Sequence, residues 1–478
     1  FGVLCVTYGV GGLSVANSTA QAYAERSPVL VISGAPGVSE RQNNPLLHHR
    51  ISSFQAQFNI FREMTCAQAV LEDPDTAGIE IARVIKTIQE TKRPGYIELP
   101  RDMVDKDTYE QVLAPQEPVS CDQEIIDQAC RAALEMISKA KNPVIIAGVE
   151  VHRFGLQDFL LKFIEHLKIP FVTGVLGKSV ITENHPQFLG VYAGAMSPDS
   201  VRLAVERSDC IIAIGPMLTD LATGMFTHHV RPAQTILVSP ENLLIGSHSY
   251  PGVSMEKFLE LMILLPQPKL NFQPQDNTQV PSFIPQSGKK ICVERLIACI
   301  NTFIEDNTVV IADVGDALFA SLDLRVHGDT DYFSPAYYAS LGFAVPASIG
   351  VGFAASEKRA LVLTGDGSFQ MSAMELSTIA RYGLNPVVIV FNNSGYGTFR
   401  PMLDGSFNDI QPWEYADIAK IIGKGKGYTV LEEEELYAAL EAARDNKISP
   451  TVIDVRLDKY DCSLRMRQLT DNLKKRVK

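Results

Sequence analysis

Residues 365–395 constrain the fold of this chain more than any other stretch. An apolar run at residues 360–363 precedes the motif Gly-Asp-Gly-Ser at residues 365–368, and a second apolar run at residues 387–391 precedes Asn-Asn-Ser-Gly at residues 392–395. Continuous apolar runs of this length are typical of parallel strands that are covered on both faces. The stretch therefore predicts a parallel sheet whose strands end in polar turns, as in an α/β fold.

The polar residues after these two predicted strands suit a site for a metal and a phosphate. Gly365 and Gly367 allow a tight turn, and Ser368 is predicted to be the N-cap of the helix that follows. The free N–H groups of a helix N-terminus bind anions such as phosphate. Asp366 and Asn393 each offer a side-chain oxygen, and Mg²⁺ takes one or two such ligands together with phosphate oxygens and water. Gly-Asp-Gly alone is a weak signal, so the alternative is an ordinary turn between a strand and a helix.

Composition and charge exclude several classes of protein. The chain has 478 residues, of which 46% are hydrophobic, which is enough for about two to four domains with their own cores. No apolar run is long enough to cross a membrane. The net charge of −12 argues against a nucleic-acid partner, because nucleic acids attract basic surfaces. Eight scattered cysteines without a Cys-x-x-Cys pair indicate reduced thiols and a cytoplasmic protein.

The order of strand and helix patterns predicts three α/β domains, each built on a doubly wound parallel sheet. The first covers residues 1–105, and the second, with a Rossmann-like pattern, covers residues 120–265. The second has no Gly-x-Gly-x-x-Gly motif, so no nucleotide site is predicted there. Residues 266–289 contain five prolines among glutamines and asparagines and are predicted to be a linker to the third domain, residues 290–478. The predicted strands are residues 3–7, 29–33, 95–99, 144–148, 171–173, 210–215, 235–238, 308–313, 360–364, 387–391 and 451–455.

Two pairs of adjacent histidines are candidates for chemistry. His48 and His49 follow a loop rich in glycine and asparagine, and adjacent side chains point in different directions on most backbones, so both would rarely be structural. They lack a third ligand at metal-binding spacing, but they suit proton transfer near neutral pH. The competing interpretation is a solvated pair in a loop. His228 and His229 have no accompanying motif, and the structural interpretation is favoured for them.

Taken together, these motifs resemble those of the thiamin-diphosphate-dependent 2-oxo-acid decarboxylases, the family of pyruvate, indolepyruvate and phenylpyruvate decarboxylases. The resemblance extends over essentially the whole chain, and the tandem histidines separate this branch from the acetolactate-synthase and benzoylformate branches. The motifs that carry it are Val-Thr-Tyr-Gly-Val-Gly at residues 6–11, Tyr-Ala-Glu at 23–25, Ile-Ser-Gly-Ala-Pro at 32–36, Leu-His-His at 47–49, Gly-Asp-Gly-Ser-Phe-Gln at 365–370, Asn-Asn-Ser-Gly-Tyr at 392–396 and Trp-Glu-Tyr-Ala at 413–416.

The resemblance implies a fold, a reaction and an assembly. The three domains would be a pyrimidine-binding, a middle and a diphosphate-binding domain. The reaction would be the non-oxidative decarboxylation of a small-molecule 2-oxo acid to an aldehyde and CO₂, with thiamin diphosphate and Mg²⁺ as cofactors. In the family the cofactor lies between the pyrimidine-binding domain of one subunit and the diphosphate-binding domain of another, so a homodimer or homotetramer is expected.

The resemblance also implies roles for individual residues. Asp366, Asn393 and the carbonyl of Gly395 would hold Mg²⁺, and His48 and His49 would donate protons in catalysis. Residues expected to contact the cofactor are Gly315, Asp316, Ala339 through its carbonyl, Leu341 beneath the two rings, and Gly365, Gly367, Ser368 and Asn393 around the diphosphate. A plain core position is the alternative for Leu341. Asp220 matches an active-site acid of the phenylpyruvate-type members weakly.

Two departures from the family pattern bear on activity and substrate. The glutamate that binds the pyrimidine ring, and an aspartate that joins the histidines, belong to the segment before Phe1, and the chain opens directly in a predicted strand. We therefore expect the N-terminal part of the pyrimidine-binding domain to be missing from this sequence. Pyruvate decarboxylases carry a glutamate at the position of Phe399, so the apolar residue here favours a bulky or aromatic substrate such as phenylpyruvate or indolepyruvate.

Two alternatives to the decarboxylase remain. One is a thiamin-dependent carboligase of the acetolactate-synthase type, which would have a flavin-binding middle domain and no tandem histidines. The other is a non-catalytic truncated fragment that binds Mg²⁺ and a diphosphate, or another subunit, without turnover. An assay of aldehyde and CO₂ release distinguishes these alternatives from a decarboxylase.

Overall fold

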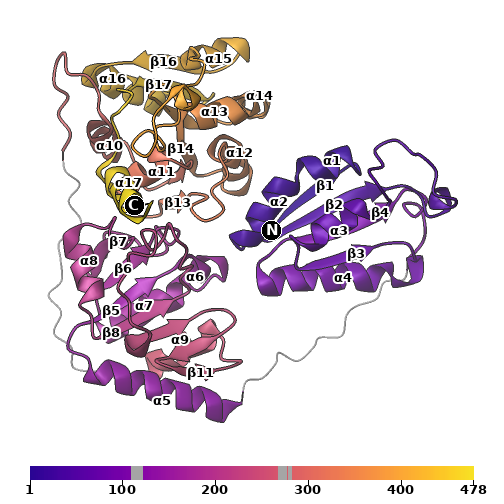
Figure 1. Ribbon diagram of the computed structural model, residues 1–478, viewed down its shortest axis with the longest axis horizontal. Coiled ribbons are helices and arrows are strands. Elements are labelled where there is room, and N and C mark those ends of the chain that lie inside the picture. Colours follow the sequence, from indigo (N-terminus) through magenta and orange to yellow (C-terminus); the bar gives the residue numbers. More distant parts are fainter. Residues whose placement is uncertain (109–121, 267–276, 278–281, 478) are drawn as a thin grey trace. The chain divides into compact units, whose positions relative to one another are not determined.

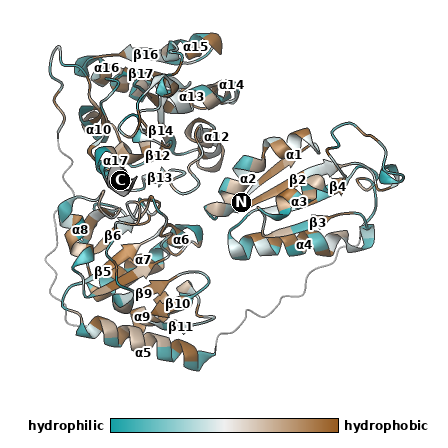
Figure 2. Ribbon diagram, in the orientation of Figure 1, coloured by the Kyte–Doolittle hydropathy of each residue, from teal (hydrophilic) through white to brown (hydrophobic). Residues whose placement is uncertain are grey.

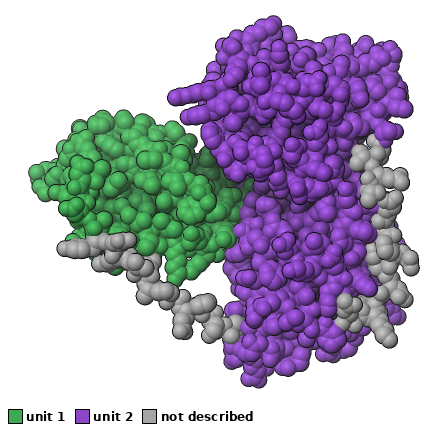
Figure 3. All heavy atoms as spheres, turned by 180° about the vertical axis from the view of Figure 1, so that it is seen from behind, with its two compact units in different colours: residues 1–120 green, residues 121–478 purple. Residues whose placement is uncertain are grey.

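The computed structural model describes residues 1–108, 122–266, 277 and 282–477. Two compact units make up the chain, Phe1–Ser120 and Cys121–Lys478 (Figure 3). The first unit contains one sheet and the second contains two, and helices flank each of them (Figure 1). The predicted α/β class with three sheets is therefore confirmed. Within the described ranges, no helix is long and apolar enough to cross a membrane.

The sheet of the first unit is parallel throughout, with the strand order β1-β2-β4-β3. Its strands are β1 (Gly2–Val6), β2 (Val29–Ala35), β3 (Ala67–Val70) and β4 (Gly95–Pro100). Its helices are α1 (Val10–Ser14), α2 (Ala16–Ala24), α3 (Ala56–Arg62) and α4 (Pro74–Thr91). The three strands predicted from the sequence are present. The strand β3 escapes prediction because Ala-Gln-Ala-Val is too short and too weakly apolar a run.

Helices on both faces of this sheet complete two small cores. On one face Phe61 of α3 stacks on Tyr96 of β4, with the ring centroids 4.4 Å apart. On the other face α4 buries Val84 and Ile88 against the strands. The helix α4 is amphipathic, so its apolar stripe alone is enough to fix which side of it faces the sheet.

The first sheet of the second unit, called the middle sheet here, has the strand order β11-β10-β9-β8-β5-β6-β7. Its strands are β5 (Pro143–Ala147), β6 (Phe171–Gly174), β7 (Phe188–Tyr192), β8 (Cys210–Ile214), β9 (Thr235–Val238), β10 (Leu243–Ile245) and β11 (His248–Tyr250). Strand β10 runs antiparallel to β9 and β11, so this sheet is mixed rather than wholly parallel. The helices are α5 (Gln123–Lys139), α6 (Val149–Arg153), α7 (Gln157–Leu167), α8 (Asp199–Glu206) and α9 (Met255–Leu264).

The second sheet of this unit, the C-terminal sheet, is parallel throughout, with the order β13-β12-β14-β15-β17-β16. Its strands are β12 (Thr308–Ala312), β13 (Asp331–Phe333), β14 (Arg359–Gly365), β15 (Val387–Asn392), β16 (Lys426–Val430) and β17 (Thr451–Arg456). Its helices are α10 (Val293–Asn301), α11 (Asp316–Ser321), α12 (Ala344–Ala354), α13 (Asp366–Ser372), α14 (Leu376–Arg381), α15 (Ile418–Ile421), α16 (Glu433–Asp445) and α17 (Leu464–Val477). Most of the predicted linker, namely residues 267–276 and 278–281, lies outside the described residues.

Alternate residues of the central strands pack into different cores, as expected for sheets covered on both faces. In β12, Val310 and Ala312 belong to one apolar cluster, whereas Val309 and Ile311 belong to the cluster on the opposite face. Figure 2 shows the same apolar character as brown strands in the middle sheet. Burial on both faces explains why these strands read as continuous apolar runs in the sequence.

The two sheets of the second unit share part of one core. Leu318 of α11 and Met466 of α17 belong to the same buried cluster as residues of α7 and α9 from the middle sheet. A buried ion pair adds a polar connection, because Lys178 donates to Glu183 and, at 2.7 Å, to the carbonyl of Leu324. These contacts explain why the two sheets form a single compact unit.

Both sheets of the second unit contain a point where the strand order reverses. In the middle sheet this point lies between β5 and β8, because the chain passes from β5 to β6 on one side and later to β8 on the other. In the C-terminal sheet it lies between β12 and β14 for the same reason. The carboxyl edge of an α/β sheet at such a point is where ligands bind most often.

Candidate active site

The buried carboxylate of Asp366 joins the two turns that the sequence singled out. Strand β14 ends at Gly365, and α13 begins with Asp366, which is 1% exposed. Its Oδ1 accepts a hydrogen bond from Gly367 N at 2.8 Å, and its Oδ2 accepts one from Gly395 N at 3.1 Å. Burial is the main cause that raises the pKa of Asp366 to about 6. The turn after β14 is thereby tied to the turn after β15.

The prediction that Ser368 is the N-cap of this helix is wrong. The N-cap is Gly365, and Ser368 is a buried residue in the first turn of α13. The helix begins earlier than predicted because Asp366 uses its own carboxylate to satisfy the N–H of Gly367. Ser368 is therefore the third residue of the helix rather than its cap.

The geometry around these turns fits a bound diphosphate and its metal. A Cβ added to Gly365 would meet no atom within 4 Å, so there is open space beside the start of α13. Among the described residues, no group of three His, Cys, Asp or Glu could hold a metal ion. A metal here would instead take mixed oxygen ligands, and the carboxylate of Asp366, the side chain of Asn393 and the carbonyl of Gly395 could supply them. Hard oxygen donors completed by phosphate suit Mg²⁺.

The two consecutive asparagines have separate tasks. The side chain of Asn392 is buried and donates to Asp454 on β17 at 2.8 Å, which anchors the end of β15 inside the sheet. The side chain of Asn393 packs against Gly397, where an added Cβ would lie 2.6 Å from its Nδ2. Because β15 ends at Asn392, only Asn393 of the two belongs to the turn that carries Gly395.

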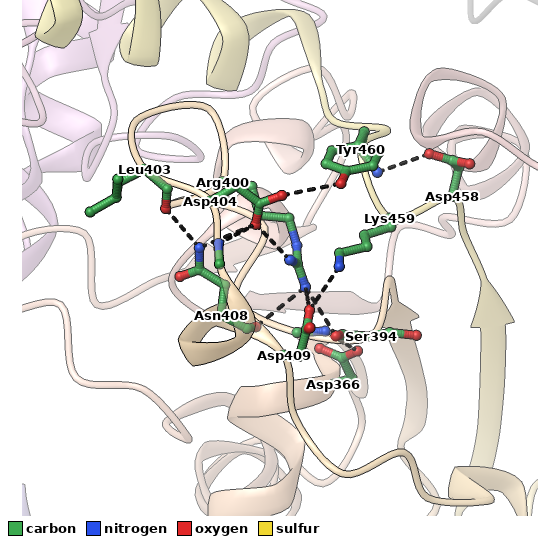
Figure 4. Close-up of polar contacts among 12 residues, drawn as sticks. Asp366, Ser394, Arg400, Leu403, Asp404, Asn408, Asp409, Asp458, Lys459 and Tyr460 are labelled. Carbon is green, nitrogen blue, oxygen red and sulfur yellow. Dashed lines mark hydrogen bonds and ion pairs between the residues drawn. The ribbon is translucent and has the colours of Figure 1, made fainter.

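Arg400 holds this turn in place, and sequence reasoning did not identify it (Figure 4). Its guanidinium is buried and donates to the carbonyl of Ser394 at 3.1 Å, to Asp404 at 2.9 Å and to Asp409 at 2.7 Å. Lys459 pairs with the same Asp409 carboxylate at 2.9 Å. The network fixes the backbone beside Gly395. A single arginine among apolar residues, followed by two aspartates within a few residues, was the available sequence signal.

The turn after β12 lies close to the segment that contains Thr398 and Arg400. Gly315 is the N-cap of α11 with φ of 98°, and a Cβ added to it would lie 3.4 Å from Thr398 Oγ1. The carboxylate of Asp316 accepts hydrogen bonds from the backbone N, at 2.9 Å, and the hydroxyl of Ser463, which hold the start of α17. Burial raises the pKa of Asp316 to about 6. Gly315 is thus beside the candidate site, whereas Asp316 has a structural partner of its own.

Asp313 is a second buried carboxylate that the sequence reading passed over. It lies directly after β12, and its Oδ2 accepts hydrogen bonds from Ala344 N and from the hydroxyl of Thr364, each at 3.3 Å. Burial raises its pKa to about 6. These contacts join the ends of β12 and β14 to the turn before α12. An aspartate at the end of a continuous apolar strand was the only sequence signal for this role.

The turn before α12 carries Ala339 and Leu341. Ala339 has a positive φ of 60°, and its N–H donates to the carbonyl of Pro335 at 2.9 Å. Leu341 is 39% exposed, so it is not a core residue of this chain. A Cβ added to the neighbouring Gly342 would lie 3.1 Å from Met371 of α13. The turn therefore presents an apolar side chain next to the helix that starts at Asp366.

His48 and His49 lie together on the surface of the first unit. The hydroxyl of Tyr8 donates to the carbonyl of His48 at 2.8 Å, and Nδ1 of His49 lies 3.3 Å from the carbonyl oxygen of Tyr8. The two imidazoles contact each other edge to face, with centroids 4.8 Å apart, rather than pointing in different directions. The reason is the positive φ of 64° at His49. A Cβ at Gly9 would lie 2.3 Å from His49 O, so glycine is required there.

A buried network of hydrogen-bonded polar side chains lies next to His49. Gln57 accepts from Gly9 N at 2.6 Å and donates to Ser33 and to the hydroxyl of Tyr96, which donates to Glu98 at 2.7 Å. Burial raises the pKa of the Glu98 carboxyl. Glu98, Gln57 and His49 line one small pocket. None of these long-range contacts leaves a local pattern in the sequence.

Phe399 and Asp220, the remaining two predicted site residues, lie beside different sheets. Phe399, on the turn that Arg400 anchors, is 52% exposed and available to a substrate or another chain. Asp220 follows β8 in the middle sheet, where its Oδ1 accepts from Leu221 N at 2.8 Å and shapes its own turn. The structure thus brings Asp366, Asn393, Gly395, Gly315, Leu341 and Phe399 to the carboxyl edge of the C-terminal sheet, whereas Asp220 lies at that of the middle sheet.

Family models match three parts of the chain. The N-terminal TPP binding domain of thiamine pyrophosphate enzymes matches residues 1–60. The central domain of these enzymes matches residues 130–259. Their C-terminal TPP binding domain matches residues 313–455, which include the carboxyl edge described above.

Related proteins narrow the family. The indole-3-pyruvate decarboxylase of Azospirillum brasilense is 34% identical, over 92% of this chain and 81% of the relative. Pyruvate decarboxylase 1 of Pisum sativum is 32% identical, over 97% of this chain and 81% of the relative. The alpha-keto-acid decarboxylase of Mycobacterium leprae is 31% identical, over 95% of this chain and 82% of the relative. The chain therefore belongs to the thiamin-diphosphate-dependent 2-oxo-acid decarboxylases, a family of carboxy-lyases.

Proposed function

We propose that the chain decarboxylates a 2-oxo acid with a bulky or aromatic side chain to an aldehyde and CO₂, using thiamin diphosphate and Mg²⁺. The observation that carries this proposal is the buried Asp366 carboxylate, which bonds to the turns after β14 and β15 beside open space at Gly365. A carboxylate in this position needs a positive partner, because burial disfavours its charged form. A divalent metal bound to a diphosphate is such a partner.

The chain's own residues would hold the cofactor rigidly. Asp366, Asn393 and the carbonyl of Gly395 would bind Mg²⁺, while Gly365, Gly367 and Ser368 would line the diphosphate. Thiamin diphosphate, when bound, supplies the electron sink that stabilises the charge left on the substrate's carbonyl carbon as CO₂ departs. Leu341 would support the cofactor rings, with Ala339 and Gly315 beside them, since its side chain is presented outward from a turn that Asp313 anchors.

His48 and His49 would handle protons. Nδ1 of His49 faces the carbonyl oxygen of Tyr8, which can only accept a hydrogen bond, so Nδ1 carries the hydrogen. Nε2 of His49 is then the nitrogen that exchanges a proton with the reacting molecule. The contact between the two rings keeps His48 close enough to influence that proton.

The substrate side chain is proposed to be apolar. Phe399, Leu403 and Phe407 are all more than half exposed and lie on the segment anchored by Arg400, directly after the proposed metal ligands. An aromatic surface at this place favours phenylpyruvate or indolepyruvate over pyruvate. The name of the Azospirillum brasilense relative, an indole-3-pyruvate decarboxylase, supports the same class.

The functional form is proposed to be a homodimer or homotetramer. Tyr337, Tyr338 and Leu341 form an exposed apolar group on one turn, which a monomer would leave in water. Light scattering of the purified protein measures the mass directly. A monomer at concentrations where the enzyme turns over would contradict this part of the proposal.

Turnover tests the proposal. The protein with thiamin diphosphate and Mg²⁺ is supplied with phenylpyruvate, indolepyruvate or pyruvate, and the aldehyde is trapped by an alcohol dehydrogenase with NADH. We expect kcat/KM for the aromatic acids to exceed that for pyruvate by at least about tenfold. Phe399→Glu should narrow this preference, whereas Phe353→Glu, at another exposed apolar position, should leave it unchanged. Absence of aldehyde from a protein that binds the cofactor would contradict the proposed activity.

A further inference from the structure

The carboxyl edge of the middle sheet contains a cavity of about 270 Å³. It lies at the reversal point between β5 and β8, and its walls come from the turns after β5, β6 and β8. On the face of the sheet that borders the cavity, α8 is the one helix that contributes residues to the buried apolar cluster. On the opposite face, α5, α7 and α9 all contribute to the buried apolar cluster. The thinner cover leaves the space open. The place is one where α/β sheets bind ligands, yet none of the residues proposed for catalysis or cofactor binding lines it.

The backbone at this edge disfavours a phosphate. Gly148 N donates to the carbonyl of Ile214 at 2.8 Å, and Glu150 N donates to the carbonyl of Gly215 at 3.1 Å. Two of the N–H groups around the start of α6, where a nucleotide's phosphate would bind, are therefore already bonded across the reversal point. A Cβ at Gly148 would lie 2.0 Å from the oxygen of Gly215, so the two turns are in direct contact. This closure agrees with the absence of a glycine-rich nucleotide motif.

The side chains that line the cavity are almost all apolar. Among the described lining residues there is no lysine, arginine, aspartate or glutamate. Thr223 and Thr235 also line it, but their hydroxyls already donate to the carbonyls of Thr219 and Arg231 at 2.7 and 2.8 Å. An anionic ligand would find no cation in these walls, and a strongly polar one would lose its hydration without compensation.

Among the described side chains that line the cavity, His228 carries the one buried polar atom without a hydrogen-bond partner. Its Nδ1 is buried and has no hydrogen-bond partner among the residues that the structure describes. Burial, together with the neighbouring His229, lowers the pKa of His228, so its imidazole is neutral near pH 7 and Nδ1 can accept a hydrogen bond. A buried acceptor without a partner is costly, and a ligand N–H or O–H would satisfy it.

We propose that this cavity binds a neutral, planar aromatic molecule of one or two rings that donates a single hydrogen bond to His228 Nδ1. The volume supports this size, because an apolar cavity of roughly 150 Å³ is enough to hold benzene. Indole combines a flat apolar body with one N–H donor, and it is therefore the probe of choice. The site does not depend on the proposed catalytic function, since its walls belong to the middle sheet.

Gly174 offers a direct way to fill the cavity. It is the last residue of β6, it lines the cavity, and a Cβ added there would meet no atom within 4 Å. Gly174→Leu therefore places a side chain in the cavity without a backbone clash, and Gly174→Ala fills it only slightly. Ser138→Leu, on the exposed face of α5, changes the surface of the same part of the protein and is the matched control.

Calorimetric titration of indole into the whole protein, loaded with thiamin diphosphate and Mg²⁺, tests the proposal. We expect one site per chain, whose affinity falls at least tenfold in Gly174→Leu, less in Gly174→Ala and not at all in Ser138→Leu. His228→Phe should weaken indole severalfold and leave toluene, which has no N–H, unchanged. A crystal of the indole complex should show the ring against Gly174.

Two results would overturn the site: no indole binding by the wild-type protein, or indole affinity that Gly174→Leu leaves unchanged. Unchanged indole affinity in His228→Phe would overturn the assigned hydrogen bond. Aldehyde production is assayed on the same samples. Indole binding without turnover would count against the proposed function alone, and turnover without indole binding would count against this site alone.

Discussion

The turns that follow β5 in the middle sheet and β14 in the C-terminal sheet each flank a reversal point of strand order, and they have opposite chemistry. After β5, Gly148 is bonded to the neighbouring turn, and the adjacent cavity has apolar walls. After β14, Gly365 faces open space, and the next residue is the buried carboxylate of Asp366. Both edges lie at reversal points of strand order, so topology provides a crevice in each case. If both proposals hold, the residues of a few turns decide whether such an edge binds a metal and a phosphate or an apolar ring.

Removing the Asp366 carboxylate should leave the edge of the C-terminal sheet without its proposed metal-binding carboxylate, and the described cavity walls of the middle sheet contain no carboxylate either. For Asp366→Ala we expect Mg²⁺-dependent binding of thiamin diphosphate to weaken by at least about 100-fold, because a direct metal ligand is lost. Calorimetry with and without EDTA measures the effect, and Asp417→Ala, at an exposed aspartate, is the control. Unchanged Mg²⁺ dependence in the Asp366 variant would refute the assignment of this edge.

Holding the cofactor and moving protons should be separable. His49→Ala should bind thiamin diphosphate within about twofold of the wild-type affinity but turn over about 100-fold more slowly, as expected when a proton-transfer group is removed. His248→Ala, at an exposed histidine of β11, is the control. Stopped-flow detection of aldehyde and calorimetry of the cofactor together decide the outcome. Wild-type turnover would return both histidines to a structural role.

A methyl group added at each edge should act in opposite ways. Gly148→Ala forces a Cβ to within 2.0 Å of the oxygen of Gly215, so we expect the free energy of unfolding to fall by about 2 kcal/mol with little change in cofactor affinity. Gly365→Ala has room for its Cβ and should keep its stability, but it should weaken the cofactor severalfold because it occupies the space beside the diphosphate. Denaturant titration and calorimetry of both variants measure this contrast. If both variants changed stability and cofactor affinity equally, the proposed difference between the two sheet edges would be contradicted.

Arg400, which is proposed only to position the turn beside Gly395, should matter less than the proposed metal ligand Asp366. Arg400→Met keeps an unbranched apolar stem but loses the bonds to Ser394, Asp404 and Asp409, so the turn beside Gly395 becomes less ordered. We expect Mg²⁺ affinity in the presence of thiamin diphosphate to fall about tenfold, as for other residues that support a metal ligand. Arg381→Met, at an exposed arginine, serves as the control. An excess of Mg²⁺ should restore turnover in the Arg400 variant, and failure of this rescue would argue against a positioning role.

Much of the fold was predictable because its central strands are buried on both faces. Residues 29–33, 210–215 and 387–391 stand out as apolar runs for this reason, and the structure has strands there. Strands β3, β7, β10, β11, β13 and β16 were not predicted, since none of them is a continuous apolar run of four or more residues. The N-cap was misplaced because the carboxylate of Asp366, rather than Ser368, satisfies the start of α13.

The sequence alone determined the α/β class and the family, because these depend on local order and on residue types, and it singled out the residues that we propose bind the metal and move protons. Only the tertiary structure decided that Asp366 reaches Gly395, that Arg400 holds the same turn and that Gln57 connects Gly9 to Tyr96. It also decided that the turns after β5 and β8 close against each other while a cavity stays open beside them. These features depend on contacts between residues distant in the chain, and such contacts exist only once the strands have taken their places in the sheet.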